Sequence, residues 1–373
     1  MLKTIGKKAV ILVMAATLGA SLLAGCSGSN NKVVTKPSQE GAATSSSSQV
    51  TSLTGAGATF VYPFFSKAFN TYGGQNNLQV NYQSIGSGGG IKQFTAQTVD
   101  FGASDVPMNE KELAAAAKTG GEVVQFPVTL GAEAITYNIP EVKEQLKFTP
   151  QVLADIFLGK IKNWNDPAIV KDNPNASLPN QPIVVVHRSD GSGTTFIFTD
   201  YLSSVSEEWK SKVGKAKDVK WPVGVGAKGN EGVAGQVLKT PYAIGYNELA
   251  YAIQTNMTYG LLMNKDGKFV APSLESATAA AGQLPDVSPK QFSIVNAPGA
   301  DSYPIAGYSW VLLYKNQTDS AKGTSLVKLF EWVVTQGQDD AKSLNYAPLP
   351  ENVRSKAIET LKTVQSNGTA LLK

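Results

Sequence analysis

The chain of 373 residues contains one cysteine, Cys26, and one histidine, His187. A single cysteine excludes an intrachain disulfide framework, and this pair alone cannot supply a zinc site of the usual four-ligand kind. Any Ser-His-Asp catalysis would have to use His187. Lys and Arg number 33 and Asp and Glu number 29, so the net charge is +4. This balance is too even to indicate a nucleic-acid-binding protein.

Charged residues are scarce as well, at 17%, whereas 42% of the residues are hydrophobic. That composition predicts a folded chain, and the length favours about two domains. After the N-terminal segment, no run of 18 consecutive apolar residues occurs. The sequence therefore predicts no later membrane span.

The N-terminus is typical of a secretory signal. Residues 1–25 combine basic residues near the start with an apolar run that ends in Leu23-Ala24-Gly25-Cys26. This ending resembles a bacterial lipobox, and the run is shorter than the roughly 20 residues that a span needs. We expect cleavage before Cys26 and lipidation of Cys26, which would anchor the protein to the outer face of the cell membrane. Residues 26–52 are rich in small polar residues, and we expect a disordered tether.

The remaining body alternates short apolar strands with amphipathic helices, which predicts an α/β fold. We find no internal repeat and no second linker. Strands are predicted at Leu78–Tyr82, Val99–Ala103, Ala134–Ile139, Ile183–Val186, Tyr242–Tyr246 and Ile305–Tyr314. Helices are predicted from Pro63, at Ile91–Thr98, Asn109–Lys118, from Pro150, and at Thr194–Leu202, Gly232–Leu238, Ser320–Thr335 and Glu351–Val364.

Four glycine-containing turns lie next to predicted helices or strand ends. Exposed N–H groups at a helix start favour an anion, and glycines let the backbone approach it closely. Arg188, in the fourth turn, would add a planar charged fork that suits an oxyanion. Sequence spacing does not show whether the turns converge. They are Gly55–Phe60, Gly86–Gly90, Gly102–Asp105 and His187–Thr194.

Two aspartates in these turns, Asp105 and Asp190, would repel an anion. They are either turn and capping residues or part of the specificity. An ionised carboxylate accepts hydrogen bonds only, so it suits a ligand that still carries a proton, such as phosphate, and disfavours sulfate. Asp190 could instead orient Arg188. The segment Gly224–Gly229 fits a dinucleotide pattern, but no clear buried strand precedes it, so we do not expect nucleotide binding.

Several stretches together resemble the phosphate-binding proteins of bacterial phosphate ABC transporters. They cover nearly the whole body in order. The matching stretches are Leu53–Phe60, Asn81–Gly90, Val99–Asp105, Leu158–Trp164, Arg188–Thr194 and Ala243–Tyr246. One difference is Gly88, where family members often have serine.

The resemblance implies a two-lobed α/β periplasmic-binding-protein fold of type II with a hinged central cleft. The first lobe would comprise residues 53–127 and 304–373, and the second residues 128–303. It also implies capture of inorganic phosphate and its delivery to membrane permease subunits with their ATPase, by a monomer without cofactor, metal or enzymatic activity. Phosphate would be bound by Thr59, the backbone N–H of Phe60, Ser87, Asp105, Arg188, Ser192, Gly193 and Thr194, with Asp190 supporting Arg188.

Other functions stay open. The chain could bind another oxyanion such as sulfate, molybdate or tungstate, and Asp105 is the residue that would separate phosphate from these. An extracellular phosphatase with Ser87 or Ser192 as nucleophile is a second alternative, although the sequence offers no obvious base for either serine. A surface adhesin or phosphate sensor could coexist with uptake.

Overall fold

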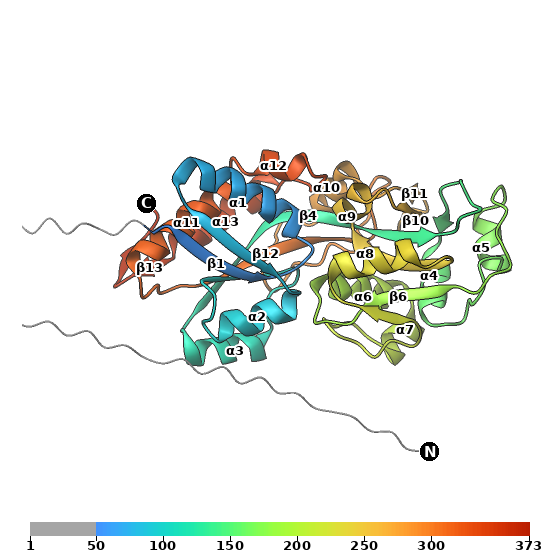
Figure 1. Cartoon of the computed structure of the whole chain (residues 1–373), viewed down its shortest axis with the longest axis horizontal. Helices are drawn as coiled ribbons and strands as arrows, with labels where there is room; N and C mark the ends of the chain where they lie inside the picture. Colours follow the sequence, from blue (N-terminus) through green and yellow to red (C-terminus); the bar gives the residue numbers. More distant parts are fainter. Residues whose placement is uncertain (1–49) are drawn as a thin grey trace, which may run out of the picture. The chain divides into compact units, whose positions relative to one another are not determined.

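The computed structural model describes residues 50–373, which include the whole predicted body (Figure 1). The predicted signal segment, Cys26 and nearly all of the predicted tether lie outside the described residues. Within residues 50–373, no helix is both long and apolar enough to cross a membrane.

One mixed sheet of nine strands forms the framework (Figure 1). Parallel strands form both ends of the sheet, and the central strands are antiparallel. In spatial order the strands are β2 (Gln79–Ser84), β1 (Ser52–Gly57), β3 (Phe101–Ser104), β12 (Ala306–Tyr314), β4 (Val123–Asn138), β8 (Ala243–Glu248), β6 (Val184–Arg188) and β7 (Val225–Ala227), and β9 (Thr258–Tyr259) also pairs with β4. A second, three-stranded sheet contains β11 (Phe269–Val270), β10 (Leu261–Met263) and β5 (Lys147–Phe148). A third, two-stranded sheet contains β13 (Gln365–Ser366) and β14 (Thr369–Ala370).

Strand β4 joins the two halves of the sheet. Its first part pairs with β12 and its second part pairs with β8. We predicted only the second part, from Ala134, whereas the strand begins at Val123 and its first part includes Pro127, which lacks a backbone donor. The structure accommodates Pro127 at an irregularity in the register, between Ser309 and Trp310 of β12. The predicted lobe boundary after residue 127 therefore falls inside a continuous strand.

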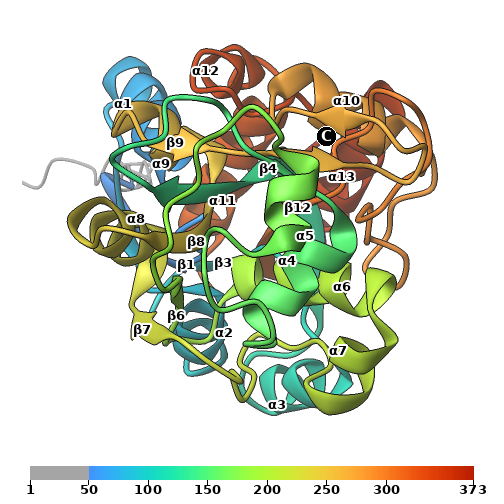
Figure 2. The same ribbon diagram turned by 90° about the vertical axis from the view of Figure 1, so that its right-hand side faces the viewer.

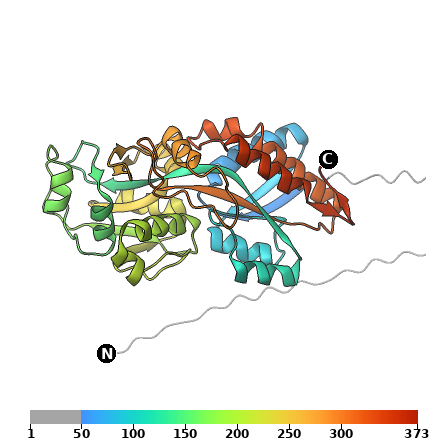
Figure 3. The ribbon, with the colours of Figure 1, turned by 180° about the vertical axis from the view of Figure 1, so that it is seen from behind.

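Helices cover both faces of the sheet (Figures 1–3). In one half α8 packs on one face of β6 and β8, and α6 packs on the other (Figure 2). In the other half α11 and α13 lie side by side (Figure 3). The helices are α1 (Tyr62–Asn76), α2 (Ser87–Thr95), α3 (Glu110–Thr119), α4 (Pro150–Phe157), α5 (Pro167–Asp172), α6 (Gly193–Val205), α7 (Glu207–Lys212), α8 (Gly229–Lys239), α9 (Leu249–Gln254), α10 (Leu274–Gly282), α11 (Ser320–Val334), α12 (Gln338–Lys342) and α13 (Glu351–Lys362).

The elements predicted from periodicity are present. Helix α1 buries the five apolar residues from Phe64 to Tyr72 that define its predicted inner face. Helix α3 begins with the predicted capping box, in which Asn109 and Glu112 bond reciprocally to each other's backbone N–H.

Helix α2 begins at Ser87, four residues before the predicted start. Its glycines allow close packing, because a Cβ on Gly90 would lie 2.3 Å from Cα of Gly57, the last residue of β1. The second glycine turn is therefore largely the first turn of a helix.

Candidate functional site

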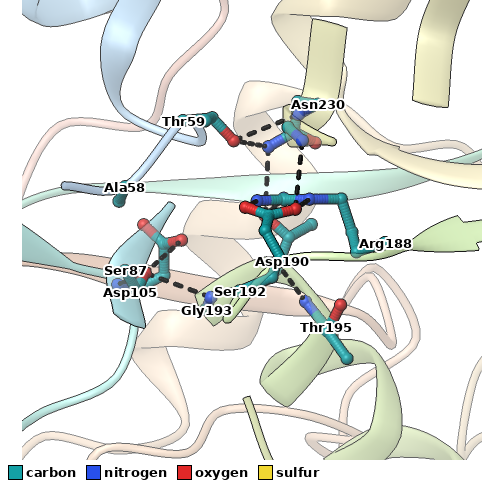
Figure 4. Close-up of polar contacts among 12 residues, drawn as sticks. Ala58, Thr59, Ser87, Asp105, Arg188, Asp190, Ser192, Gly193, Thr195 and Asn230 are labelled. Carbon is teal, nitrogen blue, oxygen red and sulfur yellow. Dashed lines mark hydrogen bonds and ion pairs between the residues drawn. The ribbon is translucent and has the colours of Figure 1, made fainter. Parts of the chain in front are cut away.

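The predicted site residues lie between the two halves of the sheet, where the carboxyl ends of parallel strands from each half face one another. Thr59 follows β1, Asp105 follows β3, and Arg188 ends β6. Ser87 begins α2, and Ser192 is the N-cap of α6. Crevices beyond the carboxyl ends of parallel strands are the usual ligand sites of α/β proteins. The four predicted turns thus converge: Ser87 bonds to Asp105 and to Gly193 (Figure 4), and Gly86 N–H donates to the carbonyl of Gly57.

Arg188 is held by two bonds to Asp190. Its Nε and Nη2 donate to Asp190 Oδ1 and Oδ2 at 2.7 and 2.6 Å, and Nη1 donates to Thr194 Oγ1 at 3.3 Å. Only 2% of Arg188 is exposed. Burial favours the neutral forms of both groups, but the ion pair outweighs it: the pKa of Asp190 is lowered and that of Arg188 is raised. The expected pairing is therefore present, and it fixes the guanidinium plane.

Asp105 and Ser87 form a second polar cluster (Figure 4). Ser87 Oγ lies 3.4 Å from Asp105 Oδ2 and accepts from the N–H groups of Asp105 and Gly193 at 3.2 and 3.0 Å. Ser309 of β12 donates to Asp105 Oδ1 at 2.8 Å. Burial raises the pKa of Asp105 to about 7, although the Ser309 bond and the charge of Arg188 oppose the rise. Asp105 can therefore gain or lose a proton near neutral pH.

The remaining predicted residues are backbone or capping groups. Ser192 Oγ accepts from Thr195 N–H at 2.9 Å and so caps α6, which leaves its hydroxyl proton available for another acceptor. The Phe60 side chain is fully buried and packs edge-on against Tyr346. The carbonyl of Thr59, which shares a peptide unit with the N–H of Phe60, accepts from Tyr251 Oη at 2.6 Å.

Sequence reasoning missed Asn230. It is fully buried at the start of α8 and contacts both Thr59 and Thr194. It directly follows the segment Gly224–Gly229, which we set aside for want of a preceding strand. The structure places β7 within that segment, and Gly229 N–H donates to Asp190 Oδ1 at 3.1 Å. The sequence signal for Asn230 was the strand–turn–helix pattern around Gly224–Gly229, because it places the start of a helix at this site.

Two buried carboxyls behind the site were also missed. Glu133 of β4 and Glu248 of β8 are directly paired in the register and fully buried. Burial raises the pKa of each well above its ordinary value. Both oxygens of Glu133 lack a hydrogen-bond partner among residues 50–373. We infer that Glu133 is neutral, because an unpaired buried charge is very costly.

The site is rich in hydrogen-bond donors and contains one carboxyl that can exchange a proton. This arrangement can hold a small anion by directed hydrogen bonds. His187 lies beside it, stacked on Trp221 with ring centroids 4.7 Å apart, and burial lowers its pKa. Within residues 50–373, no group of three or more His, Cys, Asp or Glu residues is arranged to hold a metal ion.

The fold belongs to a known class. The PBP superfamily domain matches residues 42–335, so the chain is a member of that superfamily. A high-affinity periplasmic phosphate-binding protein, solved with phosphate bound, superposes with a TM-score of 0.68 at 21% identity, over 86% of this chain and 96% of the other. This similarity shows the shared two-lobed α/β fold.

Closer relatives define the family within that class. The phosphate-binding protein PstS of Pasteurella multocida is 48% identical over 84% of this chain and 91% of its own length. The protein of the same name from Xylella fastidiosa is 45% identical over 90% of this chain and 92% of its own length. The chain belongs to this family of phosphate-binding proteins.

Proposed function

We propose that the chain captures inorganic phosphate outside the cell membrane and delivers it unchanged to the permease of a phosphate ABC transporter. One observation carries the proposal: residues from both predicted lobes converge on one buried cluster that pairs an arginine fork with a protonatable aspartate. The names of the close relatives and the phosphate-bound structure support the choice of ligand.

In this proposal Arg188, held by Asp190, is the charged donor. The hydroxyls of Thr59, Ser87, Ser192 and Thr194 and the N–H groups of Phe60 and Gly193 complete the donor set. Asp105 accepts the proton that phosphate retains at neutral pH, which a fully deprotonated sulfate lacks. The predicted lobes, 53–127 with 304–373 and 128–303, close over the ligand by a hinge.

We also propose that Cys26 is lipidated after cleavage of residues 1–25, which keeps the protein at the extracytoplasmic face of the membrane. Support comes from the sequence alone, because Cys26 lies outside the described residues. The partners of this proposal are the permease subunits and their ATPase, and the protein acts as a monomer.

The test is calorimetric titration of the chain from residue 27 onward with phosphate and then sulfate, after unfolding and refolding to remove any ligand carried through purification. We expect tight binding of phosphate and negligible binding of sulfate. Asp105→Asn should weaken phosphate binding by about 10-fold or more, because a hydrogen bond to a charged group is lost, and should narrow the gap between the two anions. No heat and no thermal shift with phosphate, in folded protein, would refute the proposal.

A phosphatase is less compatible with this geometry. Ser87 Oγ accepts two backbone N–H bonds, which engage the lone pairs that nucleophilic attack requires. Turnover of p-nitrophenyl phosphate, with and without divalent metals, would reveal such an activity and contradict the proposed passive role.

A further inference from the structure

Asn230 bonds to threonines from two separate turns. Its Nδ2 donates to Thr59 Oγ1 at 2.8 Å and to Thr194 Oγ1 at 3.1 Å. Its backbone N–H also donates to Thr59 Oγ1, at 3.1 Å (Figure 4). One fully buried side chain therefore links a residue of the first predicted lobe to a residue of the second.

The orientation of the Asn230 amide follows from its other contact. Asn230 Oδ1 accepts from the backbone N–H of Glu248 at 2.9 Å. That N–H can only donate, so the amide oxygen must face Glu248 and the amide nitrogen must face the threonines. The reversed amide would bring two donors together.

This orientation determines what the two hydroxyls can do. A hydroxyl has one proton and two acceptor lone pairs. The N–H groups of Asn230 occupy both lone pairs of Thr59 Oγ1. Asn230 Nδ2 and Arg188 Nη1 occupy those of Thr194 Oγ1. Each threonine hydroxyl is left with only its proton to offer to another group.

We propose that Asn230 is a positioning residue that makes Thr59 and Thr194 obligate hydrogen-bond donors toward the bound anion. The inference rests on the proposed function, in which both threonines contact phosphate. It also adds to the specificity, because neither hydroxyl can turn to accept the proton of the ligand. The protonated oxygen of phosphate is then directed to Asp105.

Double-mutant cycles on phosphate affinity, measured with the full-length chain in detergent, test this role. Asn230→Ala should weaken binding by about 10-fold or more, because two donors lose their orientation. In a Thr59→Val, Thr194→Val background the same substitution should cost much less, because its targets are gone. In a Ser87→Ala background, the combined loss of affinity should equal the product of the two single losses to within about 2-fold, because Asn230 does not contact Ser87.

Asn264 is the matched control. Its buried amide donates to the carbonyls of Gly299 and Ala300 and accepts from the N–H groups of Asp266 and Lys268, so its role is structural. Asn264→Ala should lower Tm without loss of affinity. If Asn230→Ala does not fold, Asn230→Asp, which has the same size but lacks the donor, takes its place in the cycle.

The outcomes separate the two proposals. The role of Asn230 would be overturned if Asn230→Ala weakened phosphate binding as much in the Thr59→Val, Thr194→Val background as in the wild type. It would also be overturned if an Asn230 variant bound phosphate like the wild type. Either result would leave phosphate capture intact. A folded, ligand-free wild-type protein that does not bind phosphate would overturn both.

Discussion

Three buried carboxyl groups, of Asp105, Glu133 and Glu248, surround an arginine that is already neutralised by Asp190. The pKa of Asp105 is raised by burial and lowered by Ser309 and Arg188, and burial followed by the charge of Asp105 raises the pKa of both Glu133 and Glu248. The site therefore carries little net positive charge. Attraction for an anion must come mainly from directed N–H and O–H groups, which also distinguish one anion from another.

Asp105→Asn should stabilise the ligand-free protein at pH 8 and have little effect near pH 4. The pKa of Asp105 is about 7 in the folded protein against 3.8 ordinarily. The folded state thus holds the proton more tightly, so stability is lost as pH rises from about 4 to 7. The difference corresponds to at most about 4 kcal/mol at pH 8, and urea unfolding at both pH values measures it.

Asp190→Asn provides the opposite control, because the pKa of Asp190 is lowered in the folded protein. At pH values above the ordinary pKa of an aspartate, this variant should have a lower free energy of unfolding than the wild type. The difference between the two proteins should disappear as the pH falls below that pKa. An Asp105→Asn protein that is less stable than wild type at pH 8 would contradict the raised pKa.

The residues that sequence reasoning found and missed differ in one respect. Arg188 and Asp105 lie in glycine turns whose chemistry is visible locally. Asn230 and Tyr251 act on Thr59, from 171 and 192 positions further along the chain. No local pattern marks an asparagine or tyrosine for such a contact, which depends on how the sheet brings β1 near the start of α8.

At the scale of elements, the N-termini of α2, α6 and α8 meet at the site. Each presents N–H groups and the positive end of a helix dipole. They approach closely because glycines lie at the contacts: Gly88 N–H donates to the carbonyl of Gly191 at 2.8 Å. Gly193 is packed against the predicted ligand residues themselves, since its Cβ would lie 2.5 Å from Asp105 Oδ2 and 2.6 Å from Ser87 Oγ.

Gly193→Ala should weaken phosphate binding by about 10-fold or more, because the added methyl group forces α6 away from Asp105 and Ser87. Gly235→Ala is the control, since its Cβ would meet nothing within 4 Å in α8. It should stabilise the protein by up to about 1 kcal/mol and leave affinity unchanged. Titration and thermal melting measure both effects, and equal affinities for the two variants would contradict the packing argument.

Element existence was more predictable than element ends. Apolar periodicity identified α1, α11 and α13 because tertiary packing there follows the helix face. The start of α2 was misplaced because its glycines were read as a turn, whereas they serve packing against Gly57. The structure accommodates Pro127 in the first part of β4 next to Val128, an extra β4 residue without a partner in β12, and β12 lies far away in the sequence, so no local pattern marks this pairing.

At the scale of the whole molecule, ion pairs join the two predicted lobes at Lys217–Glu112 and at Lys356–Asp286, and the first of these adjoins the fourth turn of the site. Lys217 contacts Glu112 of α3, and their side chains are 16% and 22% exposed. The same stretch supports the fourth turn, because the carbonyl of Lys217 accepts from Ser192 N–H at 2.7 Å. The other oxygen of Glu112 caps its own helix through Asn109.

Lys217→Met should weaken phosphate binding by about 2- to 5-fold at low salt, because the pair favours the closed arrangement. The difference from wild type should disappear near 1 M NaCl, where screening is strong. Lys212→Met, which removes an exposed pair with Glu208 within one lobe, should have no effect on affinity. If Lys217→Met weakened phosphate binding equally at low and high salt, the loss would not come from the charge of the Lys217–Glu112 pair.

The shared strand β4 also constrains the order in which the protein can be made and folded. Its first part, from Val123, pairs with β12, which ends at Tyr314. During synthesis that edge must wait for most of the remaining chain, including all of β8 and the segments after it. The half of the sheet formed by β1, β2, β3 and the first part of β4 therefore stays incomplete until β12 has been translated. Until then its unpaired strand edges can pair with wrong partners.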